Sequence, residues 1–135
     1  MADGQKSASC VLFFGHDTGL LVTRQLLLER EGCDVHVVRS IQEFRAGVLG
    51  QTFQLILLCQ SLSPDECESA SRFAREHAPS TRLLLMFTRV GKCMPEHADV
   101  LLDSLSGPKV FVETARRMLA TAPSRLTRPS SAAPI

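Results

Sequence analysis

Five short apolar segments alternate with longer segments of helical periodicity, and this alternation restricts the fold more than any other feature of the sequence. The apolar segments cover residues 10–14, 34–38, 53–59, 82–87 and 98–102. Most are continuous runs of Val, Leu, Ile and Phe, which are typical of strands that are covered on both faces. Strands that alternate with helices favour right-handed crossovers into one parallel sheet. We therefore expect an α/β protein with helices on both faces of a five-stranded sheet.

Helix-capping residues mark where the intervening helices begin. Asp17 or Thr18 can cap the first helix, and Ser40 can cap the second. Ser63 precedes a proline and several acidic residues, which indicates the start of the third helix, and Pro108 indicates the start of the last. The predicted helices cover residues 18–31, 41–49, 64–77 and 108–119.

The chain of 135 residues fits one domain. We predict that residues 10–120 form a flavodoxin-like three-layer sandwich with strand order 2-1-3-4-5, the common doubly wound order. Residues 1–9 are polar and are expected to be disordered. Residues 121–135 are rich in Pro, Ser and Ala and should form a disordered tail. Residues 88–97 contain a glycine and a proline, which favour a short, distorted turn.

Composition excludes several classes of partner. A net charge of +1 offers no basic surface for nucleic acid, and the apolar runs are too short to span a membrane. The N-terminal residues lack the apolar stretch of a secretory signal, so a cytoplasmic location is expected. The sequence has five cysteines and no CxxC pair, and in a reducing compartment all five should stay thiols. No His, Cys or carboxylate spacing predicts a metal site or a cofactor.

Two stretches carry a family resemblance. Residues 11–38 read VLFFGHDTGLLVTRQLLLEREGCDVHVV, and residues 53–64 read FQLILLCQSLSP. Together they resemble the receiver domains of bacterial response regulators, in which a similar leucine-rich segment ends the first helix before the second strand. The resemblance extends over about residues 10–119. It implies a signal-transduction module of the two-component type, the class that takes part in phosphorelays.

The resemblance also assigns the positions at which receivers carry out phosphoryl chemistry. Receivers bind a divalent cation through an acidic pair after the first strand and accept the phosphoryl group on an aspartate that ends the third strand. Here the acidic pair falls on Gly15 and His16, or on His16 and Asp17 after a shift of one residue. The acceptor position falls on Cys59. At most one carboxylate therefore remains, which is a poor Mg²⁺ site.

The remaining receiver positions are also replaced. The small hydroxyl residue that ends the fourth strand falls on Phe87, with Thr88 one step later, and the lysine falls on Ser104. The resemblance therefore implies a pseudo-receiver that is not an enzyme and is not phosphorylated on aspartate. We expect it to act by protein–protein interaction with a signalling kinase or another regulator.

Two other functions remain open at the same edge of the sheet. Cys59 could be a redox-sensing thiol that His16 activates and Asp17 orients, although no basic neighbour is evident in the sequence. The simpler interpretation makes Cys59 a small buried residue, Asp17 a helix cap and His16 an exposed loop residue. The vacant phosphorylation site could also bind a small ligand.

The last predicted helix offers a surface for self-association. Its charged residues can face outward beside Val112, while Val110, Phe111 and Met118 are the better core candidates. We predict a weak homodimer through the fifth strand, this helix and the shortened segment before them, with Val112 and Arg116 in the interface. The outward-facing charged residues are Lys109, Glu113, Arg116 and Arg117.

Overall fold

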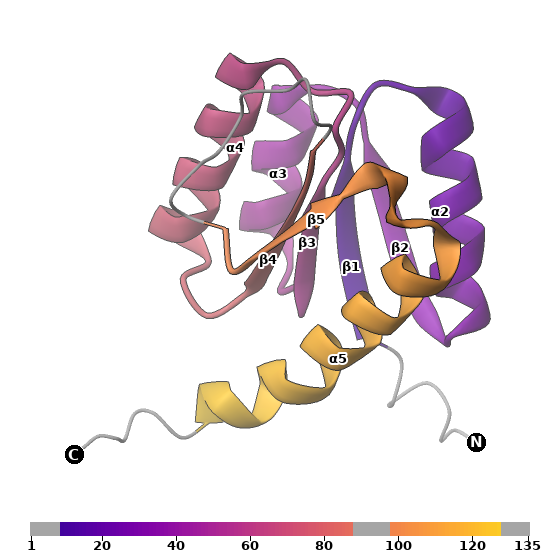
Figure 1. Cartoon of the computed structure of the whole chain (residues 1–135). Coiled ribbons are helices and arrows are strands. Elements are labelled where there is room, and N and C mark those ends of the chain that lie inside the picture. The colour runs from indigo at the N-terminus through magenta and orange to yellow at the C-terminus, as the bar shows by residue number, and fades with distance from the viewer. Residues whose placement is uncertain (1–8, 88–97, 128–135) are drawn as a thin grey trace.

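The computed structural model describes residues 9–87 and 98–127, and its centre is a parallel sheet (Figure 1). The strands are β1 (Ser9–Phe14), β2 (Cys33–Val38), β3 (Leu55–Leu58), β4 (Arg82–Phe87) and β5 (Val100–Asp103). They lie in the order β2-β1-β3-β4-β5, and every neighbouring pair is parallel. The predicted flavodoxin-like topology is therefore confirmed.

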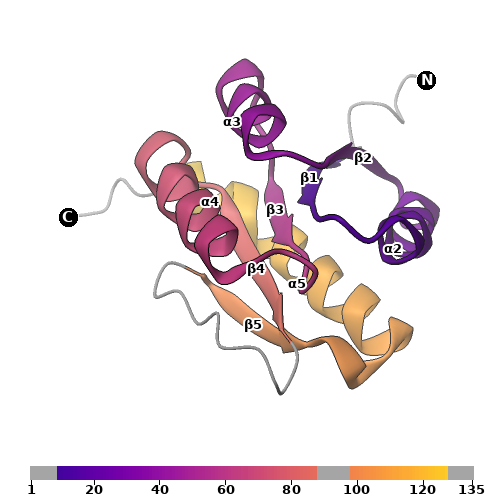
Figure 2. The same ribbon diagram turned by 90° about the horizontal axis from the view of Figure 1, so that it is seen from above.

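Helices cover both faces of the sheet (Figure 2). They are α2 (Thr18–Arg30), α3 (Ile41–Gly50), α4 (Pro64–His77) and α5 (Pro108–Thr127), and a short 3-10 helix, η1 (Ser104–Ser106), follows β5. Helices α2 and α5 pack on one face and α3 and α4 on the other. No helix in the part of the chain that the structure describes is long and apolar enough to cross a membrane.

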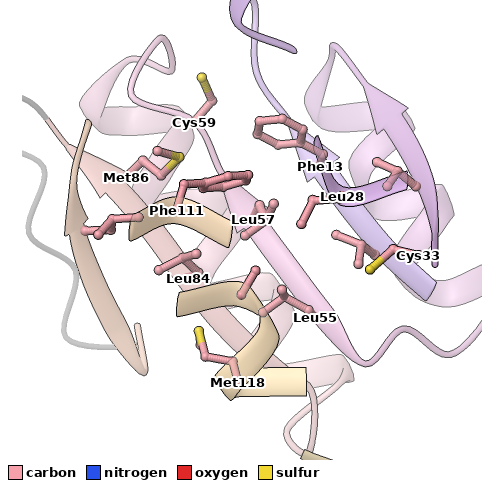
Figure 3. Packing of buried hydrophobic residues seen from close by; sticks show 14 of the residues in the cluster. Phe13, Leu28, Cys33, Leu55, Leu57, Cys59, Leu84, Met86, Phe111 and Met118 are labelled. Carbon is pink, nitrogen blue, oxygen red and sulfur yellow. The ribbon is translucent and has the colours of Figure 1, made fainter. Parts of the chain in front are cut away.

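The core consists of two apolar layers separated by the sheet. Along β1, Val11 and Phe13 belong to the layer beneath α2 and α5, whereas Leu12 and Phe14 belong to the layer beneath α3 and α4. All four side chains are at most 1% exposed, as expected for a strand covered on both faces. Figure 3 shows the first layer, in which Phe111 of α5 lies over the central strands.

Side-chain caps fix the helix starts close to where the sequence predicts them. The Asp17 carboxylate accepts a hydrogen bond from the Leu20 amide at 3.0 Å, so Asp17 rather than Thr18 caps α2. Ser40 caps α3 in the same way. Ser63 and Glu66 form a reciprocal capping box at the start of α4.

The strand and helix ends differ from the predictions in several places. β3 is shorter than the apolar run at residues 53–59, and β5 begins two residues later than expected. The sequence predicts a disordered tail from residue 121, whereas α5 continues to Thr127. No glycine, the residue that most often ends a helix, interrupts α5. The predicted turn at residues 88–97 and the rest of the predicted tail lie outside the described residues.

The buried face of α5 also differs from the prediction at one position. Phe111 and Met118 are buried as predicted, at 2% and 3% exposed. Val110 was expected in the core, but its side chain is 40% exposed, because the start of α5 turns the position next to Phe111 away from the sheet. Val110 therefore belongs to the surface of the protein.

Candidate functional site

The predicted site residues follow the carboxyl ends of neighbouring strands. Phe14 of β1 pairs with Leu58 of β3, so Gly15 and Cys59, the next residues, are adjacent. The amide of Cys59 also donates a hydrogen bond to the Phe14 carbonyl at 2.9 Å, which extends this pairing by one residue. This edge is where open α/β sheets usually bind ligands.

Gly15 packs directly against Cys59. A Cβ atom built on Gly15 would lie 2.6 Å from the Cβ atom of Cys59, and 3.1 Å from both Leu21 Cδ2 and Ser61 Oγ. Real Cβ atoms do not approach other atoms this closely, so the backbone arrangement leaves no space for a side chain at residue 15. Cys59 itself is 1% exposed.

His16 is held away from Cys59 by contacts with the loop after β3 and with α4. Its Nε2 lies 2.8 Å and 2.9 Å from the two carboxylate oxygens of Glu66. Its backbone amide donates to the Ser61 hydroxyl at 2.8 Å, and the Asp17 amide approaches the same oxygen at 3.3 Å. In the part of the chain that the structure describes, no hydrogen bond joins His16 to Cys59.

The carboxylate of Glu66 is stabilised in its charged form. Partial burial on its own would raise the pKa of Glu66, but hydrogen bonds from the Ser63 amide and from His16 outweigh burial and hold that pKa below its ordinary value. The Ser63 amide donates to Glu66 Oε1 at 3.0 Å. Glu66 therefore joins the loop after β1 to the start of α4.

Arg24 of α2 is a basic neighbour of Cys59 that sequence analysis missed. Its Nη1 donates to Gln60 Oε1 at 2.9 Å and lies 3.7 Å from the Cys59 sulfur. The guanidinium carbon lies 5.9 Å from the ring centroid of Phe111, which is cation–π distance. Burial lowers the pKa of Arg24, while the nearby Cys59 and Asp17 oppose that effect.

One signal in the sequence could have revealed Arg24. It lies four residues from both Leu20 and Leu28, and residues spaced by four share one face of a helix. Leu28 is 1% exposed, so this face is directed at the core. An arginine on a buried helix face needs a polar partner, but the spacing on the helix does not identify that partner.

Solved structures similar to this chain were found in several organisms. A response regulator receiver domain protein from Methanospirillum hungatei JF-1 matches with a TM-score of 0.72 and 19% identity, covering 87% of this chain and 98% of that one. The signal receiver domain of a putative Luxo repressor protein from Vibrio parahaemolyticus gives 0.76 and 15%, covering 87% and 95%. The chain has a receiver fold. No protein-family model matches its sequence, and no curated protein is significantly similar to it.

One of the similar receiver domains binds a divalent cation, so we compared the residues of this chain with the needs of such a site. The receiver domain of the sensor histidine kinase PA1611 from Pseudomonas aeruginosa PAO1 holds a magnesium ion in its active-site cleft; it matches at a TM-score of 0.75 and 14% identity, covering 84% of this chain and 99% of that one. The residues that the family resemblance assigns to the cation site do not fit this ion, which requires oxygen ligands. Gly15 has no room for a carboxylate, His16 is paired with Glu66, and Cys59 supplies sulfur. Within the described residues no three His, Cys, Asp or Glu side chains form a metal-binding group.

The residues that the resemblance assigns to the other receiver positions, Phe87 and Ser104, lie along the same edge. Phe87 ends β4 and is half-buried, and its strand partner is Asp103 of β5. Ser104, at the lysine position, is half-buried and opens η1, where the Asp103 carboxylate accepts a hydrogen bond from the Leu105 amide at 2.9 Å. Thr88 lies outside the described residues.

The Cys, His and Asp side chains do not form a relay in this receiver fold. The carboxylate of Asp17 caps α2, and the ring of His16 contacts Glu66. Cys59 stays a free thiol, as do Cys10 and Cys33, whereas Cys67 is disulfide-bonded. The prediction that all five cysteines are thiols is therefore wrong for Cys67, because it rested on an assumed reducing compartment and not on geometry.

The proposed interface residues of α5 both have partners within the chain. Arg116 contacts Glu31 at the end of α2, with Nη2 2.6 Å and Nε 3.1 Å from the same carboxylate oxygen. This pairing raises the pKa of Arg116. Val112 is half-buried and packs against the core layer beneath α5. A substitution at Val112 or Arg116 would therefore disturb the monomer as well as an interface.

Proposed function

We propose that this chain is a receiver-like signalling module that acts by binding other proteins and is not phosphorylated on aspartate. The solved structures that it resembles are described as response regulator or signal receiver domains, which supports signal transduction as the class of function. The close packing of Gly15 on Cys59 is the observation that carries the second half of the proposal.

The chemistry of phosphoryl transfer explains why this packing matters. Transfer requires positioning of the reacting groups and neutralisation of the charge that develops on the transferred phosphoryl oxygens, a task usually given to a metal ion or a cation. Gly15 and His16 supply no carboxylate for a metal ion, the single carboxylate of Asp17 caps α2, and Cys59 supplies no carboxylate acceptor. The same absence supports a role as a binding module rather than as an enzyme.

Intact-mass measurement after incubation with acetyl phosphate and MgCl₂ tests this proposal. We expect no increase in mass for the wild-type chain. The variant Cys59→Asp should also stay unmodified, because Gly15 and His16 still provide no metal site beside the new carboxylate. A receiver with its acidic pair intact serves as the positive control. A mass increase of one phosphoryl group on the wild-type chain would overturn the proposal.

A thiol-based sensor is the second candidate, and one observation favours it. A guanidinium group beside a thiol stabilises the thiolate, and Arg24 Nη1 lies 3.7 Å from the Cys59 sulfur. Burial of Cys59 opposes the idea, because a sensing thiol has to be reached by its oxidant. The rate at which the Cys59 thiol is alkylated distinguishes a thiol-based sensor from a protein-binding module.

The partner is proposed to be a signalling kinase or another regulator, and weak self-association is part of the proposal. β5 is an edge strand, and three exposed apolar side chains lie on and after it: Leu101 at 41%, Leu105 at 76% and Val110 at 40% exposed. A similar solved structure is the beryllofluoride-activated receiver domain dimer of NtrC4. These three residues replace Val112 and Arg116 as the better anchors of the proposed interface. A cytoplasmic location belongs to the same proposal, and the disulfide at Cys67 would then be an exception to the reduced state that is usual in that compartment.

A further inference from the structure

A cavity of about 190 Å³ lies between α2 and α5, near the carboxyl ends of β4 and β5. Its walls are mainly apolar and include Leu20, Leu27, Met86, Leu102 and Phe111. Figure 3 shows Met86 and Phe111 on the Cys59 side of this core layer. An apolar cavity of about 150 Å³ in a protein core can bind benzene, so this one is large enough for a ring or a short branched chain.

Arg24 is the basic residue on the wall of the cavity. Hydrogen bonds engage its Nη1, whereas Nε and Nη2 make none with residues 9–87 and 98–127. These two nitrogens form the side of a guanidinium that binds a carboxylate with two parallel hydrogen bonds. Because Arg24 is partly withdrawn from water, an anion on this side would compensate for the lost hydration.

We propose that this cavity binds a small organic acid with an apolar body, whose carboxylate is held by Nε and Nη2 of Arg24. The apolar body fills the space between Leu27 and Phe111. Ser104 also lines the cavity, and its side chain is short.

The carboxylate of Asp103 also lines the cavity and has to be accommodated. It lies at the end of β5, whereas Arg24 contacts Cys59 and Gln60 after β3. Two strand spacings, about 10 Å, separate these strands. An acid whose carboxylate faces Arg24 therefore places its apolar end, not its charge, near Asp103.

This inference is independent of the proposed function. An acid can bind beside Arg24 whether or not the chain is phosphorylated, and acetyl phosphate labelling reports on Cys59 and its neighbours rather than on the cavity. The two proposals can therefore fail separately.

Benzoate and its uncharged analogue benzyl alcohol provide the direct comparison. In titrations followed by methyl NMR, we expect benzoate to shift the signals of Leu20, Leu27 and Met86. Benzyl alcohol should bind at least about tenfold more weakly, because it loses the charged hydrogen bonds to Arg24. Equal affinity for the two compounds, or shifts confined to other residues, would overturn the proposal. Absence of benzoate binding up to its solubility would do the same.

Substitutions on α2 then test the role of the guanidinium. Arg24→Gln should weaken benzoate binding about tenfold and leave benzyl alcohol binding unchanged, whereas Arg24→Lys should keep a preference for benzoate. Arg30→Gln, on the exposed end of the same helix, is the matched control and should bind as the wild type does. Leu27→Phe should fill the cavity and weaken both compounds. Unchanged benzoate binding in Arg24→Gln would refute the assigned contact.

Discussion

The Cβ atom of Cys59 occupies the space that a side chain at Gly15 would need, because a Cβ atom there would come within 2.6 Å of it. Gly15 and Cys59, which the family resemblance assigns to the first acidic position and the acceptor position, are therefore coupled in this chain. A carboxylate cannot be restored at residue 15 unless the ends of β1 and β3 move apart. The two replacements behave as one structural change.

Gly15→Ala should lower the free energy of unfolding by about 1–3 kcal/mol, the range observed when a packed core receives an extra methyl group. Gly19→Ala is the control, since the nearest atom to a Cβ there is Asp17 Oδ1 at 3.5 Å and alanine favours a helix. Urea denaturation of both variants measures the difference. Equal effects at the two glycines would show that residue 15 tolerates a side chain.

The elements that depend on neighbouring residues could be predicted from the sequence. Asp17, Ser40 and Ser63 cap helices by accepting hydrogen bonds from amides three residues ahead, so the helix starts can be predicted from the local sequence. The contact between Arg24 and Cys59 joins residues that are 35 positions apart, and no local pattern encodes it. The same holds for the packing at Gly15, which depends on where β3 ends in space.

The errors at α5 have a similar origin. Val110 and Phe111 are both apolar, and periodicity alone did not decide which of them faces the sheet. Adjacent residues of a helix point in different directions, and Phe111 packs into the core while Val110 stays exposed. Composition suggested a tail after residue 120, whereas α5 continues to Thr127 even though Pro123 lacks the amide hydrogen of a helical backbone hydrogen bond.

Acid should weaken the contact made by Glu66. Because the pKa of Glu66 is lower in the folded protein than its ordinary value of 4.5, its contribution to stability is present above that value and is lost as the pH falls through the lowered pKa. Urea denaturation between about pH 6 and pH 3 measures this loss. Glu66→Gln, which keeps a capping side chain, should show a smaller pH dependence; the same slope in both proteins would contradict the assignment.

The thiol of Cys59 should react slowly in the folded protein. Its side chain is 1% exposed, so alkylation needs a local opening of the structure. We expect iodoacetamide to modify Cys59 at least about tenfold more slowly under native conditions than in urea, the ratio that an opening free energy of about 1.4 kcal/mol produces. Peptide mass spectrometry follows the reaction at this residue. Rapid native alkylation that slows in Arg24→Gln would favour the thiol-based sensor instead.

Self-association should depend on the apolar residues beside β5. Leu105→Asp should shift the weak homodimer toward monomer in sedimentation velocity experiments at micromolar concentrations. Leu49→Asp is the matched control, because Leu49 is 65% exposed on α3, on the opposite face of the sheet, and should leave the dimer unchanged. A monomer at every concentration, or equal effects of the two substitutions, would reject this interface.

The contacts of Asp17 and Glu66 have a consequence for the electrostatics of this sheet edge. The N-termini of α2 and α4 each carry a positive partial charge from their aligned peptide dipoles. Asp17 caps the first and Glu66 lies in the first turn of the second, so each positive end has a carboxylate from its own chain. Both carboxylates are thus engaged by groups of their own chain, so neither is available as a ligand for a dissolved divalent cation. Chelators and millimolar Mg²⁺ should consequently have the same small effect on its melting temperature.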